Sequence, residues 1–254
     1  WRHMHLTQEP GDAIMLLGAG DIIGLVPQIL KDVSSQSNDS ASKGNPIELS
    51  RFSAFRTGGV TYGRLCDSIP DPLRESIIIG AGTNTWLSDC ATNADIIKAP
   101  PESNASKPGS SLIAGHPGLA FMSGIPGTIG GWAKMNAGAF GDSFGNHIKH
   151  VIADGKEIPA AECGFGYRTS SIPGLITHVE LKSEASAQEL KSTEDYLSRR
   201  KKFPPRTCGS VFKNPSPDNP AGKLLEEAGA KSLKVGGAHV WSGHANVIVA
   251  EEGC

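Results

Sequence analysis

Glycine dominates the stretch SGIPGTIGGWAKMNAGAFG at residues 123–141, which holds six glycines, and Gly145 follows close behind. Glycine permits a positive φ angle and a close approach of the backbone to a ligand, but within regular structure it costs about 0.5–1 kcal/mol relative to alanine. A ligand or a tight packing contact should therefore offset this cost. Proline is favoured in the first turn of a helix, so Pro126 predicts a helix whose N-terminus lies in SGIPG.

A second glycine-rich segment, IIIGAGTNTWLSD at residues 77–89, predicts a short strand at 77–79 that enters a turn. It lacks the dinucleotide fingerprint, because the pattern is GxGxxT and no amphipathic helix with a later acidic residue follows. Such a turn exposes successive backbone N–H groups that can bind phosphate oxygens, although a purely structural turn is the alternative. A helix N-terminus at residues 124–131 would add unpaired N–H donors. Together the two segments predict a dinucleotide held outside the Rossmann fold.

The overall composition narrows the class of partner. The 254-residue chain carries 24 basic and 26 acidic residues, which leaves no basic surface for nucleic acid and no polybasic patch for a membrane. No apolar run reaches the roughly 18 residues of a membrane span, so we predict a small-molecule partner and no membrane insertion. The five cysteines form no CxxC pair, which favours a reducing, cytoplasmic compartment. Neither histidine pair, His3 with His5 or His147 with His150, has HExxH spacing, so no metal site is predicted.

Apolar and polar patterning predicts an α+β fold, because strands and helices mix without a regular βαβ alternation. The N-terminal region predicts a buried strand at 13–17, a short helix at 22–30 and then a polar linker. Further strands are expected at 94–99, 112–115, 150–155, 174–183 and 240–250, and helices at 186–203 and 219–230.

Two further segments carry polar residues suited to chemistry. GFGYRTS at residues 164–170 places Tyr167 and Arg168 in a loop, where a lone arginine is usually solvated or in a surface ion pair. CGSVFKNP at residues 208–215 contains Ser210 but does not match the GxSxG elbow of hydrolases. A triad of Ser210, His244 and an unassigned Asp stays open at this point.

Seven segments resemble, in the same order between residues 49 and 250, the motifs of the UDP-N-acetylenolpyruvoylglucosamine reductase family. They are RFSAFRTGG, IIIGAGTNTWLSD, FMSGIPGTIGGWAKMNAGAFG, GFGYRTS, CGSVFKNP, PAGKLLEEAGAK and GGAHVWSGHANVIV. The resemblance implies a flavoenzyme with an FAD-binding domain of the vanillyl-alcohol-oxidase type and a C-terminal substrate-binding α+β domain. It also implies that NADPH serves as co-substrate for reduction of a UDP-sugar, UDP-N-acetylglucosamine enolpyruvate, to UDP-N-acetylmuramate for peptidoglycan.

The same resemblance assigns residues. The backbone around the FAD diphosphate would come from Gly80, Ala81, Gly82, Thr83, Asn84, Thr85, Ser123, Gly124, Ile125, Pro126, Gly127, Thr128, Gly130 and Gly131. The expected catalytic residues are Arg168, which stabilises charge that develops at the substrate carboxylate, and Ser210, which donates a proton. The expected substrate contacts are Tyr167, Lys213, Asn214 and His244.

The resemblance also sets the expected domains. Residues 1–33 resemble the C-terminal end of the UDP-N-acetylmuramate:L-alanine ligase family, which predicts a piece of a ligase–reductase fusion. The linker would cover 34–47, the FAD-binding domain 48–185 and the substrate-binding domain 186–254. The third catalytic residue of the family, a C-terminal glutamate, is expected beyond Cys254, so the last domain would be incomplete. The alternative is a flavin-binding or structural remnant attached to a ligase, with impaired catalysis.

Overall fold

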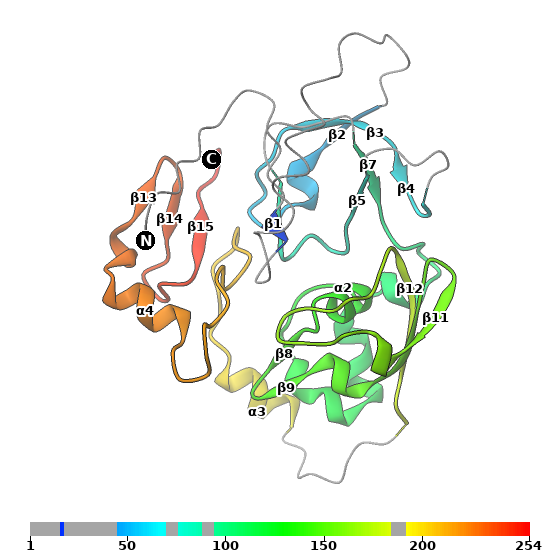
Figure 1. Cartoon of the computed structure of the whole chain (residues 1–254). Coiled ribbons are helices and arrows are strands. Elements are labelled where there is room, and N and C mark those ends of the chain that lie inside the picture. Colours follow the sequence, from blue (N-terminus) through cyan, green and yellow to red (C-terminus); the bar gives the residue numbers. More distant parts are fainter. Residues whose placement is uncertain (1–15, 18–44, 70–75, 88–93, 184–191) are drawn as a thin grey trace.

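The computed structural model of the protein describes residues 16–17, 45–69, 76–87, 94–183 and 192–254. Several predictions fall wholly or largely outside these ranges, namely the ligase-like segment 1–33 with its helix at 22–30, most of the linker at 34–47, and the first third of the helix at 186–203. The described elements form three groups, each built on small sheets of two or three strands (Figure 1). Strands and helices are mixed throughout, which confirms the α+β prediction.

The first group, at the upper right of Figure 1, contains a parallel sheet and two strand pairs. The parallel sheet has the order β4 (Leu65–Cys66), β7 (Asp95–Ile97), β5 (Ser76–Ile78). The antiparallel pairs are β2 (Asn45–Glu48) with β3 (Val60–Gly63), and β1 (Leu16–Leu17) with β6 (Thr85–Trp86). The predicted strands at 77–79 and 94–99 are confirmed as β5 and β7. Their apolar faces share a small core with η2 (Leu49–Phe52).

The second group covers residues 100–183 and holds the main core. Its sheet has the antiparallel order β11 (Lys156–Pro159), β10 (Ile148–Ala153), β12 (Ile176–Leu181). Helix α2 (Ile129–Lys134) packs against β12, and the ring of Trp132 meets Phe144 edge to face at 5.7 Å between centroids. The remaining elements are the hairpin β8 (Gly138–Ala139) with β9 (Asp142–Ser143) and the 3₁₀ helices η3 (Asn104–Ser106), η4 (Gly109–Gly115), η5 (Pro117–Met122), η6 (Phe144–His147) and η7 (Ala160–Glu162).

Two predictions in this group are wrong. The segment at 112–115 is the end of the 3₁₀ helix η4 and not a strand, because it has no partner strand and its backbone closes i to i+3 bonds such as His116 N–H to Ile113 O. Helix α2 begins at Ile129 with Thr128 as its N-cap, so Pro126 precedes the helix and is not in its first turn. Gly127 has a φ of +125°, which a helix cannot accommodate.

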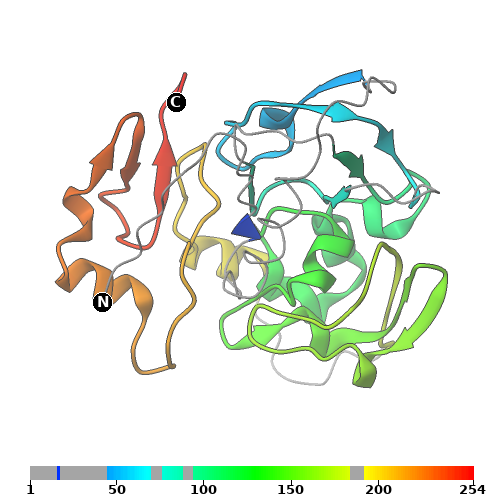
Figure 2. The ribbon, with the colours of Figure 1, turned by 45° about the horizontal axis from the view of Figure 1, so that its top comes forward.

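The third group, at the left in Figures 1 and 2, is the C-terminal part. Its sheet has the antiparallel order β13 (Lys234–Val235), β14 (Ala238–Val240), β15 (Ile248–Ala250). The predicted helix at 219–230 is present as α4 (Ala221–Glu227), and η8 (Ala230–Ser232) follows it. The helix predicted at 186–203 appears as α3 (Thr193–Arg199), which starts with a capping box between Ser192 and Asp195.

The single strand predicted at 240–250 is wrong, because β14 ends at Val240 and β15 begins only at Ile248. The backbone between them turns back, with His244 N–H bonded to Trp241 O and Val247 N–H bonded to His244 O. The HAN sequence therefore lies in a tight connection between two antiparallel strands, which places its polar side chains at one end of the sheet.

Candidate active site

The two glycine-rich segments lie directly against each other. A Cβ atom at Gly80 would stand 2.7 Å from Thr128 Oγ1, and one at Gly127 would stand 3.5 Å from Thr83 Oγ1. Real Cβ atoms are not found as close as 2.7 Å to another heavy atom without a shift, so a larger residue at position 80 would displace the Thr128 hydroxyl. The fold thus joins the predicted binding turns into one cradle, which we define as residues 80–85 and 123–131.

Contacts at Gly82 and Thr85 hold the turn at 80–85 in place. Ala54 N–H donates to Thr85 O at 2.8 Å, and Gly82, with a φ of +70°, packs so closely on Phe52 that a Cβ there would lie 2.3 Å from Phe52 O. Within the described part of the chain, none of the backbone N–H groups of residues 80–84 donates to another residue. A row of open amides of this kind is suited to phosphate oxygens.

The other side of the cradle offers fewer donors than predicted. Helix α2 has only six residues, and Thr128 Oγ1 already accepts the Gly131 N–H at 3.1 Å. The Ile129 N–H donates to Lys107 O at 3.0 Å. The Ile125 N–H donates to Met122 O at 2.9 Å. Three of the amides that residues 124–131 were expected to offer to an anion are therefore used within the protein, so the expectation of a helix N-terminus with open donors is wrong for these positions.

Two serine hydroxyls border the cradle without a protein partner. Ser53 and Ser123 are 7% and 2% exposed, and within the described residues neither Oγ atom makes a hydrogen bond. Ser53 precedes Ala54, whose N–H binds the turn at 80–85, and Ser123 is the first residue of the segment at 123–131. An unsatisfied buried hydroxyl costs about 1–3 kcal/mol, which a hydrogen-bonding ligand can recover. Together with the open amides, these hydroxyls fit an oxygen-rich group such as the diphosphate of FAD.

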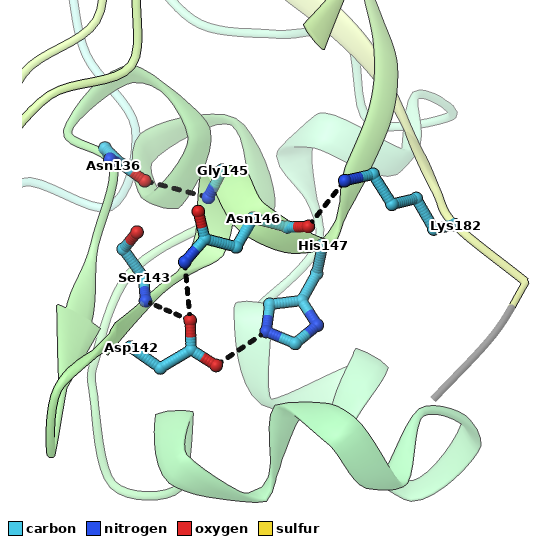
Figure 3. A network of polar contacts seen from close by, with 7 residues as sticks. All are labelled: Asn136, Asp142, Ser143, Gly145, Asn146, His147 and Lys182. Atoms are coloured by element: carbon cyan, nitrogen blue, oxygen red, sulfur yellow. Dashed lines mark hydrogen bonds and ion pairs between the residues drawn. The ribbon is translucent and has the colours of Figure 1, made fainter. Parts of the chain in front are cut away.

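Asn136 connects the glycine-rich segment to the loop that carries Tyr167 and Arg168. Its side chain is buried, donates from Nδ2 to Gly166 O and accepts the Gly145 N–H at Oδ1, both at 2.8 Å. Figure 3 shows the bond between Asn136 and Gly145 and, beside it, the Asp142 carboxylate, which accepts from Ser143 N–H, Asn146 Nδ2 and His147 Nε2. Burial alone would raise the pKa of Asp142, but these hydrogen bonds hold it below its ordinary value.

Arg168 has a left-handed backbone, with a φ of +56°, and its guanidinium donates to Gly138 O. The guanidinium carbon lies 5.3 Å from the ring centre of the exposed Tyr167. A non-glycine residue in this conformation is strained, and such strain occurs most often where a side chain must be aimed. The structure therefore presents the two residues as one half-exposed pair.

Arg200 joins the cradle to the C-terminal part. Its guanidinium donates to Phe121 O at 2.7 Å and to Ser123 O, and its Cδ packs over Gly124. Burial and then the positive charge of Arg168 lower the pKa of Arg200. Arg199 and Arg200 also lie over the ring of Phe140, at 5.0 and 5.2 Å from its centre.

Among the described residues, no ion pair involves the three arginines Arg168, Arg199 and Arg200. In the described part of the chain, their guanidinium groups face carbonyl oxygens and the rings of Tyr167 and Phe140. Such a cluster attracts an anionic ligand.

The remaining predicted residues meet in the C-terminal part. Ser210 is exposed and pairs with Val247 through an isolated antiparallel bridge, and Asn214 Oδ1 accepts the Ala221 N–H at the start of α4 at 3.0 Å. The His244 ring packs over Gly222 of the same helix. Lys213 is half-buried in the loop between these contacts. The predicted substrate residues other than Tyr167 are therefore gathered around one loop.

The hydrolase triad that the sequence left open is not formed. No hydrogen bond joins Ser210 to His244 in the described ranges, and His244 Nδ1 instead accepts the Asn246 N–H at 3.1 Å. Burial, followed by the positive charge of Lys201, lowers the pKa of His244, so the imidazole favours its neutral form.

Sequence reasoning missed Asn136, Arg200 and Asn246. The φ of Asn136 is +42°, a conformation that asparagine tolerates, but this does not indicate which groups its side chain binds. The other two lie within recognised segments but act on backbone groups far away along the chain, which no local pattern indicates.

Membrane spans, metal ligands and thiols can be stated for the residues that the structure describes. No helix among them is long and apolar enough to cross a membrane. No group of three or more His, Cys, Asp or Glu side chains could hold a metal ion. Cys66, Cys163, Cys208 and Cys254 are free thiols.

Comparison with known proteins gives consistent matches. The family model described as UDP-N-acetylenolpyruvoylglucosamine reductase, C-terminal domain, matches residues 200–254. A UDP-N-acetylenolpyruvoylglucosamine reductase from Chlamydia felis is 31% identical over 241 residues, which cover 80% of this chain and 81% of that protein. One from Anaeromyxobacter dehalogenans is 35% identical over 200 residues, and this chain spans only 60% of its length. The crystal structure of the reductase from Thermus caldophilus has a TM-score of 0.66 at 24% identity and covers 81% of this chain and 87% of that one.

Proposed function

The chain belongs to the UDP-N-acetylenolpyruvoylglucosamine reductase family, and we propose that it reduces UDP-N-acetylglucosamine enolpyruvate to UDP-N-acetylmuramate with NADPH as co-substrate. The product serves peptidoglycan synthesis. The bound cofactor would be FAD, held in a domain of the vanillyl-alcohol-oxidase type, and it would supply the hydride-transfer chemistry between the nicotinamide and the substrate.

The cradle would hold the FAD diphosphate. The open amides of residues 80–84 would donate to its oxygens, and the unpartnered hydroxyls of Ser53 and Ser123 would add two donors at the sides. Ser53 is added here to the residues that the sequence assigned. The apposed turns, with their open donors, are the observation that carries this proposal.

Arg168 would stabilise the transition state electrostatically. Reduction of an enolpyruvyl group shifts negative charge toward its carboxylate, and a guanidinium held beside that carboxylate needs no reorganisation at the moment of reaction. The hydrogen bond to Gly138 O and the Asn136 connection to Gly166 O would keep Arg168 in place. Nearby Arg199 and Arg200 would draw the doubly anionic nucleotide part of the ligands toward the site.

Ser210 would donate the proton that the substrate carbon needs. A serine hydroxyl is a weak acid, so Lys213 or ordered water would supply the driving force by lowering the cost of the alkoxide. Tyr167, Asn214 and His244 would contact the UDP-sugar. His244 is suited to a donor role because its Nδ1 already accepts the Asn246 N–H, which leaves Nε2 to carry the proton in the neutral ring.

The test is an absorbance spectrum of the purified chain. Flavin bands that bleach with NADPH and return on addition of the enolpyruvyl substrate are the expected result. A chain without flavin bands, or with bands that NADPH leaves unchanged, would contradict the proposal and favour the remnant interpretation.

The cytoplasmic location, the domain limits and the fusion to a ligase stay predictions. One contact bears on the fusion, because β1 pairs with β6 directly after the first turn of the cradle. A segment from another enzyme would thus border the cofactor site.

A further inference from the structure

One buried side chain, that of Asn246, takes the place of a neighbouring strand for the loop that contains Ser210. Its Oδ1 accepts the Phe212 N–H and its Nδ2 donates to Phe212 O, both at 2.8 Å. The side chain satisfies both backbone groups of one residue, and Asn246 is only 3% exposed. The ring of Phe212 is 53% exposed, so ring burial does little to hold this loop. The polar contacts with Asn246 therefore carry most of that task.

We call the two side-chain hydrogen bonds between Asn246 and the Phe212 backbone the clamp. The clamp extends a short ladder of backbone contacts that includes Ser210. Ser210 pairs with Val247 through the antiparallel bridge, and Val211 N–H donates to the backbone carbonyl of Asn246 at 2.9 Å. Residues 210–212 are thus all held against Asn246 and Val247, in the connection between β14 and β15. The next hydrogen bond that holds the loop, among the described residues, is the one from the Ala221 N–H to Asn214 Oδ1.

The same residue also contacts His244, one of the predicted substrate-binding side chains. The Asn246 N–H donates to His244 Nδ1 at 3.1 Å, and an imidazole nitrogen that accepts a hydrogen bond carries no proton. Neutral His244 is therefore the Nε2–H tautomer. One residue sets the position of Ser210 on one side and the proton position of His244 on the other.

We propose that Asn246 is a positioning residue that holds the Ser210 hydroxyl and the His244 Nε2–H in register on the substrate side of the site. The clamp itself is independent of any activity, whereas its effect on catalysis rests on the proposed function. A displacement of about 1 Å at a reacting group can cost on the order of 10²-fold in rate, so loss of the clamp should impair the step that uses Ser210.

The chain offers a matched control in Asn104. Its side chain makes the same double contact with a backbone residue, donating to Val179 O at 2.8 Å and accepting the Val179 N–H at 2.9 Å, but in strand β12 of the main core. Asn104→Ala and Asn246→Ala each remove two hydrogen bonds of one kind. Both variants should lose stability to urea. A change confined to Asn246→Ala then reports the position of the clamp and not the number of bonds lost.

Stopped-flow measurement on the flavin-loaded full chain separates the two half-reactions. Asn246→Ala should slow reoxidation by the enolpyruvyl substrate by on the order of 10-fold or more, while flavin reduction by NADPH stays near the wild-type rate. Asn104→Ala should leave the ratio of the two rates unchanged. Equal effects of both variants on that ratio would overturn the proposal.

Hydrogen exchange supplies a readout that needs neither flavin nor activity. In the wild-type chain, the Phe212 amide should exchange more slowly than the open amides of residues 80–84, and Asn246→Ala should remove this protection while Asn104→Ala keeps it. An unprotected Phe212 amide in the wild type would refute the clamp even if the variant fails to fold. Absence of NADPH bleaching in the wild type would instead remove the proposed function and leave the exchange result to judge the clamp.

Discussion

The contact between Gly80 and Thr128 predicts a strong energetic coupling between two distant segments. A methyl group at position 80 would lie 2.7 Å from Thr128 Oγ1, well inside an ordinary contact of about 3.5 Å. The hydroxyl can escape only by rotating, which breaks its hydrogen bond to the Gly131 N–H and removes the N-cap of α2. Loss of such a cap costs about 0.5–2 kcal/mol, so Gly80→Ala should lower the free energy of unfolding by about 1 kcal/mol.

The second variant, Thr128→Ala, removes the same cap and should cost a similar amount. With the hydroxyl gone, a methyl group at position 80 would meet Thr128 Cβ at 3.8 Å and Gly131 Cα at 3.9 Å, which are ordinary contacts. The double variant should therefore be about as stable as either single variant. The coupling energy in the double-mutant cycle should be about 1 kcal/mol.

Urea unfolding of the chain without flavin, followed by tryptophan fluorescence, measures all four proteins. A difference of about 1 kcal/mol corresponds to a shift in midpoint of roughly 0.3–1 M urea. Gly115→Ala serves as the control, because nothing lies within 4 Å of a Cβ there, and its stability should match the wild type. Additive losses, with a coupling below about 0.3 kcal/mol, would refute the contact and with it the cradle.

Two further predictions concern the proposed chemistry. Ser210→Ala removes the proton donor and should slow reoxidation of the flavin by substrate by about 10²- to 10⁴-fold. Arg168→Met removes the cation and should raise the barrier of the same step by on the order of 3 kcal/mol. Both variants should leave flavin reduction by NADPH nearly intact, and equal losses in the two half-reactions in stopped flow would contradict these roles. Burial lowers the pKa of His244, so the unfolded chain binds a proton there more readily than the folded protein. The free energy of unfolding should then fall as the pH drops below about 6.5, and His244→Gln should lose less stability across that range; identical pH curves from urea unfolding would argue against the shift.

The cradle could be predicted because its requirements are local. Gly82 and Gly127 need left-handed or otherwise unusual backbone angles, and Gly80 needs room for a neighbouring chain, so both segments carry the glycines that the contact demands. The start of α2 was misplaced by a competing local rule. Proline in a first turn favoured Pro126, but the φ of Gly127 excludes a helix there and the hydroxyl of Thr128 caps the next residues.

The side-chain clamps could not be predicted, because their partners are set by tertiary structure. Asn136 binds Gly166 across 30 residues, and Asn246 binds Phe212 across 34. An asparagine carries one amide donor group and one acceptor, so nothing in its own neighbourhood distinguishes a clamp from a turn residue. Only the meeting of two loops in space determines which backbone groups need a partner, and both asparagines act at loops that bear predicted catalytic residues.

Arg200 links the cradle to the C-terminal part of the chain. It follows α3 directly, yet its guanidinium binds the carbonyls of Phe121 and Ser123, so the start of the C-terminal part is tied to the second turn of the cradle. This position brings it near Arg168, and burial, followed by the positive charge of Arg168, lowers the pKa of Arg200. Neither arginine pairs with an acidic side chain among the described residues, so an anionic ligand would relieve the repulsion between them. Salt screens the charges of the arginines, so ligand affinity should weaken as the salt concentration rises. The loss of affinity should be larger the more of the binding energy comes from relief of this repulsion.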